Sequence, residues 1–341
     1  MKYFTGQSVD YVWKKAAKEL ISNHDYRHAG RSGETLEILP CTLRVTDPRQ
    51  RWILSRQPPY NPAFGLVEFI WMITGHDESI VPKYWNSVLP KFSGDGERFY
   101  GAYGHRLRKS FGIDQIKRAF EALRHSPKTR QVVLQIWNAD TDLPNEQGEP
   151  SSKDIPCNLI SLLKIRDGSL HWTQIVRSND IMLGLPYNFI QFTMLQELMA
   201  GWLGCDIGEY FHLSDSLHVY VDDLKTYGVD LSLKYPGKCA PRIELSFEES
   251  EKEFFSIYNQ LLEIAKKGCQ TEDELKEVFG KKSLVNSVRC PFLQDILAVI
   301  GSDTARRQKH KELARHFIAS CSDEGLRLAA ELWFKHKENA K

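Results

Sequence analysis

The sequence predicts an α+β fold that ends in a helical region, and three observations support this class. Short runs rich in β-branched and aromatic residues occur between residues 35 and 55 and again between 130 and 221. Segments with apolar residues at helical spacing separate those runs, as at residues 8–22. After Pro236 the strand-like runs stop, and amphipathic segments that open with helix-capping patterns follow.

The elements before the central hairpin follow from apolar periodicity and from the positions of Gly and Pro. They are helix 8–22, a glycine-rich basic turn at 27–33, strands 35–40 and 42–46, a possible strand at 51–55, and helices 63–74 and 114–125. Prolines at 58, 59 and 62 precede the helix at 63–74, and Gly75 closes it.

The central hairpin is predicted where two β-rich runs flank Asp167-Gly168. Capping boxes that begin at Ser246 and at Thr271 mark the starts of two later helices. The remaining elements are strand 130–137, a polar loop at 139–154, helix 189–203, strand 210–221, and helices 304–318 and 323–337.

The composition is that of a globular chain with almost no net charge. The 341 residues include 45 Lys and Arg against 44 Asp and Glu, which disfavours binding of DNA or RNA through a broad basic surface. Seven scattered cysteines without a CxxC pair argue against a disulfide framework or a zinc ribbon, so reduced thiols and a cytoplasmic location are expected. No signal peptide is recognised, and the longest apolar stretch, 64–74, is too short to span a membrane.

Four short motifs carry residue types that can do chemistry. They are Pro156-Cys157-Asn158, Arg177-Ser178-Asn179-Asp180 with the following Gly184-Leu185-Pro186-Tyr187-Asn188, His218-Val219-Tyr220, and Glu68 within an apolar helix. Each has an ordinary structural explanation, since a lone cysteine is usually buried and inert, a run of small polar residues suits a turn, and Gly-Leu-Pro suits a helix start.

In this order and spacing, the motifs together resemble the thymidylate synthase family. Arg177 follows Cys157 by 20 residues. Asn188 lies 11 residues further on, and His218 another 30. KYWNSV, FYGAYGHRLR and SPKTRQVVLQIWN extend the resemblance, which covers residues 8–225. It implies a large mixed β-sheet packed by helices and a homodimer formed through a sheet face. The change in character after Pro236 places a boundary near residue 238, between a catalytic domain at 1–238 and a helical extension at 239–341.

The resemblance implies transfer of a one-carbon unit from 5,10-methylenetetrahydrofolate, a cosubstrate, to C5 of a pyrimidine nucleoside monophosphate. Cys157 would add to C6 of the base as a thiolate, which makes C5 nucleophilic. Arg177 would lower the pKa of that thiol and bind the nucleotide phosphate. Ser178, Arg31 and, from the other subunit, Arg130 would complete the phosphate site.

The resemblance also assigns the remaining contacts to base and sugar. Asn188 would read the edge of the base, because an amide offers both a donor and an acceptor. His218 and Tyr220 would bind the 3′-hydroxyl of the sugar.

Two roles concern proton movement and the folate. Glu68 would order water and move protons around the base. Asp180 would contact the pterin ring of the folate, and Trp85 would pack near it. No metal site is expected.

The sequence departs from the family pattern in ways that bear on the product. Asn158 replaces the histidine that follows the family's nucleophile, and Gln131 replaces the second arginine of the interface pair. The chain ends in the polar stretch WFKHKENAK, whereas the family closes its site against water with a short apolar tail. Because water can add to the exocyclic methylene intermediate in place of hydride, 5-hydroxymethylation of (d)CMP or dUMP is the preferred interpretation.

Three alternatives stay open. A thymidylate synthase would methylate dUMP to dTMP, and Asn188 favours uracil because the deoxycytidylate hydroxymethylases tend to carry aspartate at that position. A catalytically inactive nucleotide-binding scaffold would recruit a partner through the helical extension. A cysteine hydrolase with His171 or His212 as its base matches no recognisable family pattern.

Overall fold

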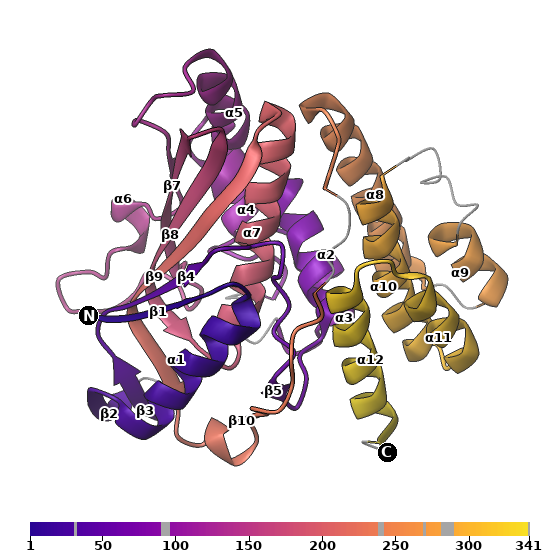
Figure 1. Cartoon of the computed structure of the whole chain (residues 1–341), viewed down its shortest axis with the longest axis horizontal. Helices are drawn as coiled ribbons and strands as arrows, with labels where there is room; N and C mark the ends of the chain where they lie inside the picture. Colours follow the sequence, from indigo (N-terminus) through magenta and orange to yellow (C-terminus); the bar gives the residue numbers. More distant parts are fainter. Residues whose placement is uncertain (31–32, 90–95, 238–241, 269–270, 281–289, 340–341) are drawn as a thin grey trace. The chain divides into compact units, whose positions relative to one another are not determined.

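The computed structural model describes residues 1–30, 33–89, 96–237, 242–268, 271–280 and 290–339 (Figure 1). It confirms the predicted α+β class and the helical character of the C-terminal region. Contacts divide the chain into two compact units. The first unit comprises residues 1–60, 114–137 and 157–236, and the second comprises 61–113, 138–156 and 237–341.

Within the described residues, the first unit holds the strands together with three α-helices. The strands are β1 (Lys2–Gly6), β2 (Tyr26–Gly30), β3 (Gly33–Ile38), β4 (Cys41–Val45), β5 (Arg56–Gln57), β6 (Val133–Gln135), β7 (Asn158–Arg166), β8 (Ser169–Asp180), β9 (Asp206–Tyr220) and β10 (Gly228–Val229). The helices are α1 (Val9–Asn23), α5 (Gln115–His125) and α7 (Gly184–Leu203).

Eight of the strands form one mixed sheet. Its main path runs β1-β4-β9-β8-β7-β6, and β3 joins β9 with β2 beside it. Strand β1 is parallel to β4 and β8 is parallel to β9, whereas the other pairs are antiparallel. The predicted hairpin joins β7 to β8, and Asp167 and Gly168 have φ values of 48° and 75°, as a two-residue type I′ turn requires.

Side chains alternate between the two faces of this sheet. On one face lie buried cross-strand rows, among them Leu163, Trp172, Tyr210 and Val45. We call the opposite face the outer face, and two rows define it. They are Val133, Leu162, Thr173, Phe211, Arg44 and Thr5, and next to them Gln135, Ile160, Ile175, Leu213, Thr42 and Tyr3. Apart from Thr42, these side chains are half-exposed or exposed.

Two sequence-based assignments in this unit are wrong. Residues 27–30 belong to strand β2 and not to a turn, because they pair with β3. Residues 51–55 are buried but do not form a strand. The carboxylate of Asp10 accepts the N–H groups of Leu54 at 2.9 Å and of Ser55 at 2.8 Å, so these donors are not available to a sheet.

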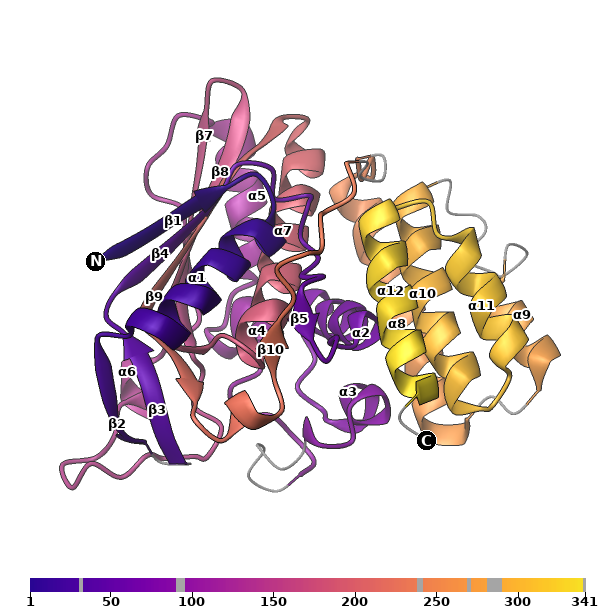
Figure 2. The ribbon, with the colours of Figure 1, turned by 60° about the horizontal axis from the view of Figure 1, so that its bottom comes forward.

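The second unit is helical (Figure 2). Its helices are α2 (Pro62–Ile73), α3 (Ile80–Trp85), α4 (Tyr103–His105), α6 (Ala139–Asp142), α8 (Phe247–Lys267), α9 (Glu272–Phe279), α10 (Pro291–Arg307), α11 (Lys311–Ser320) and α12 (Glu324–Asn339). Both predicted capping boxes are present, at the starts of α8 and α9. Figure 2 shows α10, α11 and α12 gathered in one bundle.

One predicted helix in this unit is wrong. The segment 304–318 is divided between the end of α10 and most of α11, and Lys309 between them has a φ of 68°. A left-handed residue ends the helical path, so the chain turns before α11 begins. The first three turns of α10 were not predicted, whereas α12 matches the predicted helix at 323–337 closely.

Helix α2 is apolar around its whole circumference, and every residue in it except Glu68 is buried. Gly104 of α4 lies so close to α2 that a Cβ atom there would be 2.0 Å from the Met72 carbonyl oxygen.

Among the described residues, no helix combines the length and the apolar character needed to cross a membrane.

Candidate active site

Strand pairing places Cys157 beside Arg177. The N–H of Arg177 donates to the carbonyl oxygen of Cys157 at 2.9 Å, and the ladder continues from Asn158 to Val176. Cys157 is half-buried, with a reduced thiol. The Arg177 guanidinium lies 5.6 Å from the centre of the Trp137 ring, within cation–π range. The predicted nucleophile and the predicted cation therefore start from adjacent backbone positions.

The parallel ladder between β8 and β9 brings the next motifs to the same end of the sheet. Ser178 pairs with Ser216, and Asp180 pairs with His218. Tyr220 lies two residues beyond His218, and the two rings meet edge to face with their centroids 5.6 Å apart. The ends of β8 and β9 thus carry predicted ligands for the phosphate, the sugar and the folate.

Asp180 anchors the turn that leads into α7. Its Oδ1 accepts the N–H groups of Met182 and Leu183, both at 2.8 Å, and its Oδ2 makes no hydrogen bond within the described residues. Burial raises the pKa of Asp180 and lowers the pKa of His218, since in both cases it disfavours the charged form. An N–H donor on a ligand would therefore satisfy Oδ2 and stabilise the carboxylate.

Asn188 is buried in the first turns of α7, and its amide bonds two other asparagines. Asn158 Nδ2 donates to Asn188 Oδ1 at 3.3 Å, and Asn188 Nδ2 donates to Asn179 Oδ1 at 3.4 Å. Asn158 Oδ1 in turn accepts from Gln174 Nε2 at 2.9 Å. The residue that replaces the family histidine therefore contacts the residue predicted to read the base.

The sequence-based reasoning missed these bonded amides as a functional feature. Gln174 and Asn179 are fully or almost fully buried on β8, and His212 is fully buried on β9. The sequence signal for these amides would have been a polar residue in a strand with apolar residues two positions before and after it. Such a residue shares a buried face with its neighbours and needs a hydrogen-bond partner. Gln174, between Trp172 and Val176, is an example.

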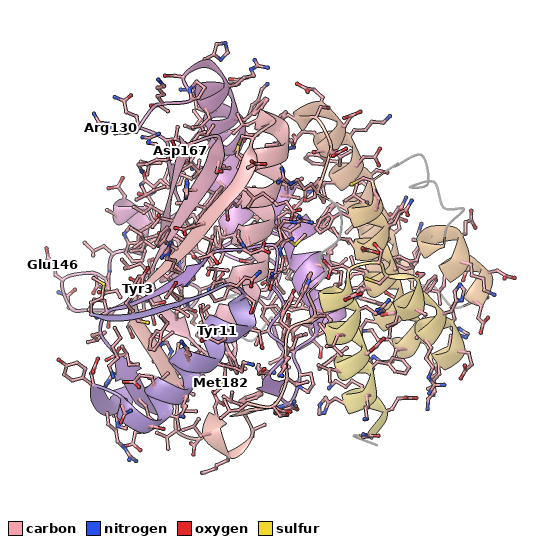
Figure 3. All side chains as sticks on the ribbon, in the orientation of Figure 1. Tyr3, Tyr11, Arg130, Glu146, Asp167 and Met182 are labelled. Atoms are coloured by element: carbon pink, nitrogen blue, oxygen red, sulfur yellow. The ribbon has the colours of Figure 1, made fainter. Side chains whose placement is uncertain are left out.

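The arginines predicted for the phosphate site differ in position. Arg31 lies outside the described residues. Arg130 is exposed in the segment between α5 and β6, and its side chain projects away from the ribbon (Figure 3). Of the predicted phosphate ligands, Arg177 and Ser178 are adjacent on β8.

Glu68 and Trp85 belong to the second unit. Glu68 is half-buried in α2. Trp85 ends α3 with its side chain 1% exposed, and its ring packs against Tyr84 with centroids 4.6 Å apart. The Trp85 carbonyl oxygen accepts from Arg307 of α10. The side chain of Trp85 is thus almost completely buried.

A reduced cysteine next to an arginine, with buried amides beside it, is an arrangement that suits an enzyme with a cysteine nucleophile and an anionic substrate. A family profile described as thymidylate synthase matches residues 18–276. The chain belongs to the thymidylate synthase family. It is therefore a one-carbon transferase that acts on C5 of a pyrimidine nucleotide, and the cosubstrate of its family is 5,10-methylenetetrahydrofolate.

Individual relatives carry two different names. A deoxyuridylate hydroxymethyltransferase of Bacillus phage SP01 is 32% identical over 269 residues, which is 73% of this chain and 68% of the phage protein. A second deoxyuridylate hydroxymethyltransferase, of Pseudomonas phage M6, is 35% identical over 66% of this chain and 63% of its own length. A thymidylate synthase of Bacillus licheniformis is 22% identical over 66% of this chain and 82% of its own length.

Proposed function

We propose that the protein hydroxymethylates C5 of deoxyuridine monophosphate. The observation that carries this proposal is the pair of phage relatives named for that reaction, which are 32% and 35% identical, against 22% for the thymidylate synthase of B. licheniformis. Asparagine at position 188 supports uracil as the base, since its amide complements N3–H and O4.

Cys157 and the residues around it would perform the first step. The thiolate of Cys157 adds to C6 of the uracil ring, and C5 becomes an enolate-like nucleophile. Arg177 favours the thiolate through its positive charge and binds the phosphate, to which Ser178 donates its hydroxyl. His218 and Tyr220 hold the 3′-hydroxyl and so fix the ring over the thiol.

The later steps deliver the carbon and then add water. C5 takes up the one-carbon unit and loses its proton, for which Glu68 is the proposed carrier. Water adds to the exocyclic methylene carbon of the base, and Cys157 leaves C6. The net change consumes one water, replaces the C5 hydrogen by CH2OH and leaves tetrahydrofolate. Methylation would instead oxidise the folate to dihydrofolate.

The carboxylate of Asp180 fits the pterin of a folate. Pterin carries ring and amino N–H donors, and Asp180 Oδ2 makes no hydrogen bond within the described part of the chain. Asp180 is the proposed pterin ligand, with Trp85 as a neighbour of the ring. When bound, the folate supplies a carbon at the oxidation level of formaldehyde.

We also propose a homodimer formed through the outer face of the sheet. Its two rows present half-exposed apolar side chains, such as Phe211, Ile175 and Leu162, and a contiguous apolar face of this kind is typical of an interface. Arg130, exposed and projecting outward, would reach the phosphate bound by the other subunit.

We further propose a cytoplasmic location, which would keep the Cys157 thiol reduced.

The proposal is tested by product analysis. The full chain is incubated with 5,10-methylenetetrahydrofolate and, separately, with dUMP, UMP, dCMP and CMP, and both products are identified by mass. We expect dUMP to gain CH2O and the folate to leave as tetrahydrofolate, with no product from Cys157→Ala. A gain of CH2 together with dihydrofolate would show a thymidylate synthase, and tight dUMP binding without turnover would show a scaffold.

A further inference from the structure

The amide of Asn188 is one link in a series of buried hydrogen bonds that begins at Trp172. The indole N–H of Trp172 donates to Gln174 Oε1 at 3.3 Å, and Gln174 Nε2 donates to Asn158 Oδ1 at 2.9 Å. Asn158 Nδ2 then donates to Asn188 Oδ1 at 3.3 Å. Trp172, Gln174 and Asn158 are fully buried, so these groups have protein partners in place of water. We call these four residues the amide chain.

Among the residues that the structure describes, only Trp172 gives the amide chain a fixed direction. An indole N–H can donate and cannot accept. A side-chain amide can exchange the positions of its donor and its acceptor by a half-turn about its terminal side-chain torsion. Gln174 must therefore turn its oxygen to Trp172 and its nitrogen to Asn158. Asn158 must then turn its nitrogen to Asn188. Ser161 donates to the same Gln174 oxygen at 2.6 Å, but a hydroxyl can also accept, so it adds no direction.

The far side of Asn188 can reverse. Asn188 Nδ2 donates to Asn179 Oδ1, and Asn179 Nδ2 lies 2.6 Å from His212 Nε2. The other ring nitrogen, Nδ1, lies 3.2 Å from the Tyr210 hydroxyl. Burial lowers the pKa of His212 to about 3, so the ring is neutral and can carry its single proton on either nitrogen. Because a hydroxyl also works both ways, this end accepts either orientation of Asn188.

The orientation of Asn188 matters because uracil and cytosine present opposite patterns. Uracil offers a donor at N3 and an acceptor at O4, whereas cytosine offers an acceptor at N3 and a donor at its amino group. An asparagine amide that turns freely matches either base. A half-turn of Asn188 in this protein would place its nitrogen against the nitrogen of Asn158 and leave buried donors facing each other.

We propose that the indole N–H of Trp172, acting through Gln174 and Asn158, fixes the amide of Asn188 in the orientation that selects uracil over cytosine. Trp172, Gln174 and Asn158 are positioning residues, because they act on the base only through Asn188. This inference rests on the proposed function, since it requires a pyrimidine nucleotide at Asn188.

Trp172→Phe removes the directing N–H while keeping an aromatic ring in place. The readout is the ratio of kcat/KM for dUMP to kcat/KM for dCMP, and we expect it to fall about tenfold or more. Both substrates are compared on one preparation of the full chain, so a smaller folded fraction cancels from the ratio. Trp52→Phe is the matched control, because Trp52 is 1% exposed and its indole N–H bonds no described residue. Its ratio should equal that of the wild type.

Asn158→Asp tests the direction of the amide chain. An ionised carboxylate accepts from Gln174 but cannot donate to Asn188, so Asn188 must turn its nitrogen toward position 158. At a pH where this carboxyl is ionised, we expect a preference shifted toward dCMP by more than in Trp172→Phe.

An unchanged ratio in Trp172→Phe, or an Asn158→Asp enzyme with the wild-type preference for dUMP, would overturn the inference. A wild-type chain that turns over neither nucleotide would instead refute the proposed function. Calorimetry would then measure the dissociation constants of dUMP and dCMP on the same variants. A Trp172→Phe protein that loses the preference for binding dUMP over dCMP would support the role of the amide chain. A Trp172→Phe protein that retains this preference would refute it.

Discussion

Replacing Asp180 by alanine and by asparagine separates its structural role from its proposed role at the folate. Alanine removes the oxygen that accepts two N–H groups at 2.8 Å. Met182 is buried, so its orphaned N–H costs about 1–3 kcal/mol, whereas Leu183 is exposed and its N–H can bond water at a cost of about 0.5–1 kcal/mol. Asp180→Ala should therefore lower the free energy of unfolding by about 1.5–4 kcal/mol.

Asparagine keeps the accepting oxygen, because both N–H groups bond the same atom, Oδ1. Asp180→Asn should lower the free energy of unfolding by less than about 1 kcal/mol. It replaces Oδ2 by a donor and removes the charge, so turnover should fall about a hundredfold or more. Urea unfolding followed by tryptophan fluorescence gives the first quantity, and the rate of product formation gives the second. Equal destabilisation by both variants would refute the shared-acceptor account, and undiminished turnover of Asp180→Asn would refute the folate role.

Three further predictions concern the dimer, the packing of the second unit and a buried histidine. Mixing Cys157→Ala and Arg130→Ala proteins, each inactive alone, should restore about a quarter of the wild-type activity, since half of the dimers are mixed and each holds one intact site. No recovery after confirmed subunit exchange would exclude a shared site. Gly104→Ala places a Cβ 2.0 Å from the Met72 carbonyl oxygen and should lower the melting temperature by several degrees, and an unchanged melting curve would contradict this packing. His212→Gln should flatten the acid side of the stability profile, because the native pKa of His212, about 3, lies below its ordinary 6.5 and the unfolded chain takes up the proton first as pH falls. Between about pH 7 and pH 5 the wild type should lose about 2 kcal/mol that the variant retains, as measured by urea unfolding at each pH.

Signals that act over a few residues predicted local structure well. Asp167-Gly168 and the capping boxes at Ser246 and Thr271 work through neighbouring backbone groups, and the structure confirms all three. The strand expected at 51–55 failed for the opposite reason. Its backbone donors bond Asp10, a partner 44 and 45 positions away, which no local pattern reports.

The candidate site shows the same contrast between features that the sequence predicts and features that depend on distant partners. Family resemblance pointed to Cys157 and Arg177, and strand register places the two side by side. The amide chain was not predictable in this way, because it requires knowing which residues of β7 and β8 share the buried face. That depends on the register that sets Ser161 opposite Gln174, which the sequence alone does not specify.

Strands β7, β8 and β9 alternate between the outer face and the buried face, so the proposed interface and the buried amides are interleaved residue by residue. An insertion of one residue that is not taken up as a β-bulge would exchange the two sets from that point on, with amides turned outward and Phe211 or Ile175 turned inward. Substitution can alter either face separately, but a change in length cannot. Variation in length is therefore expected in connecting segments such as 139–154, and the three strands should keep their residue count even where their composition drifts.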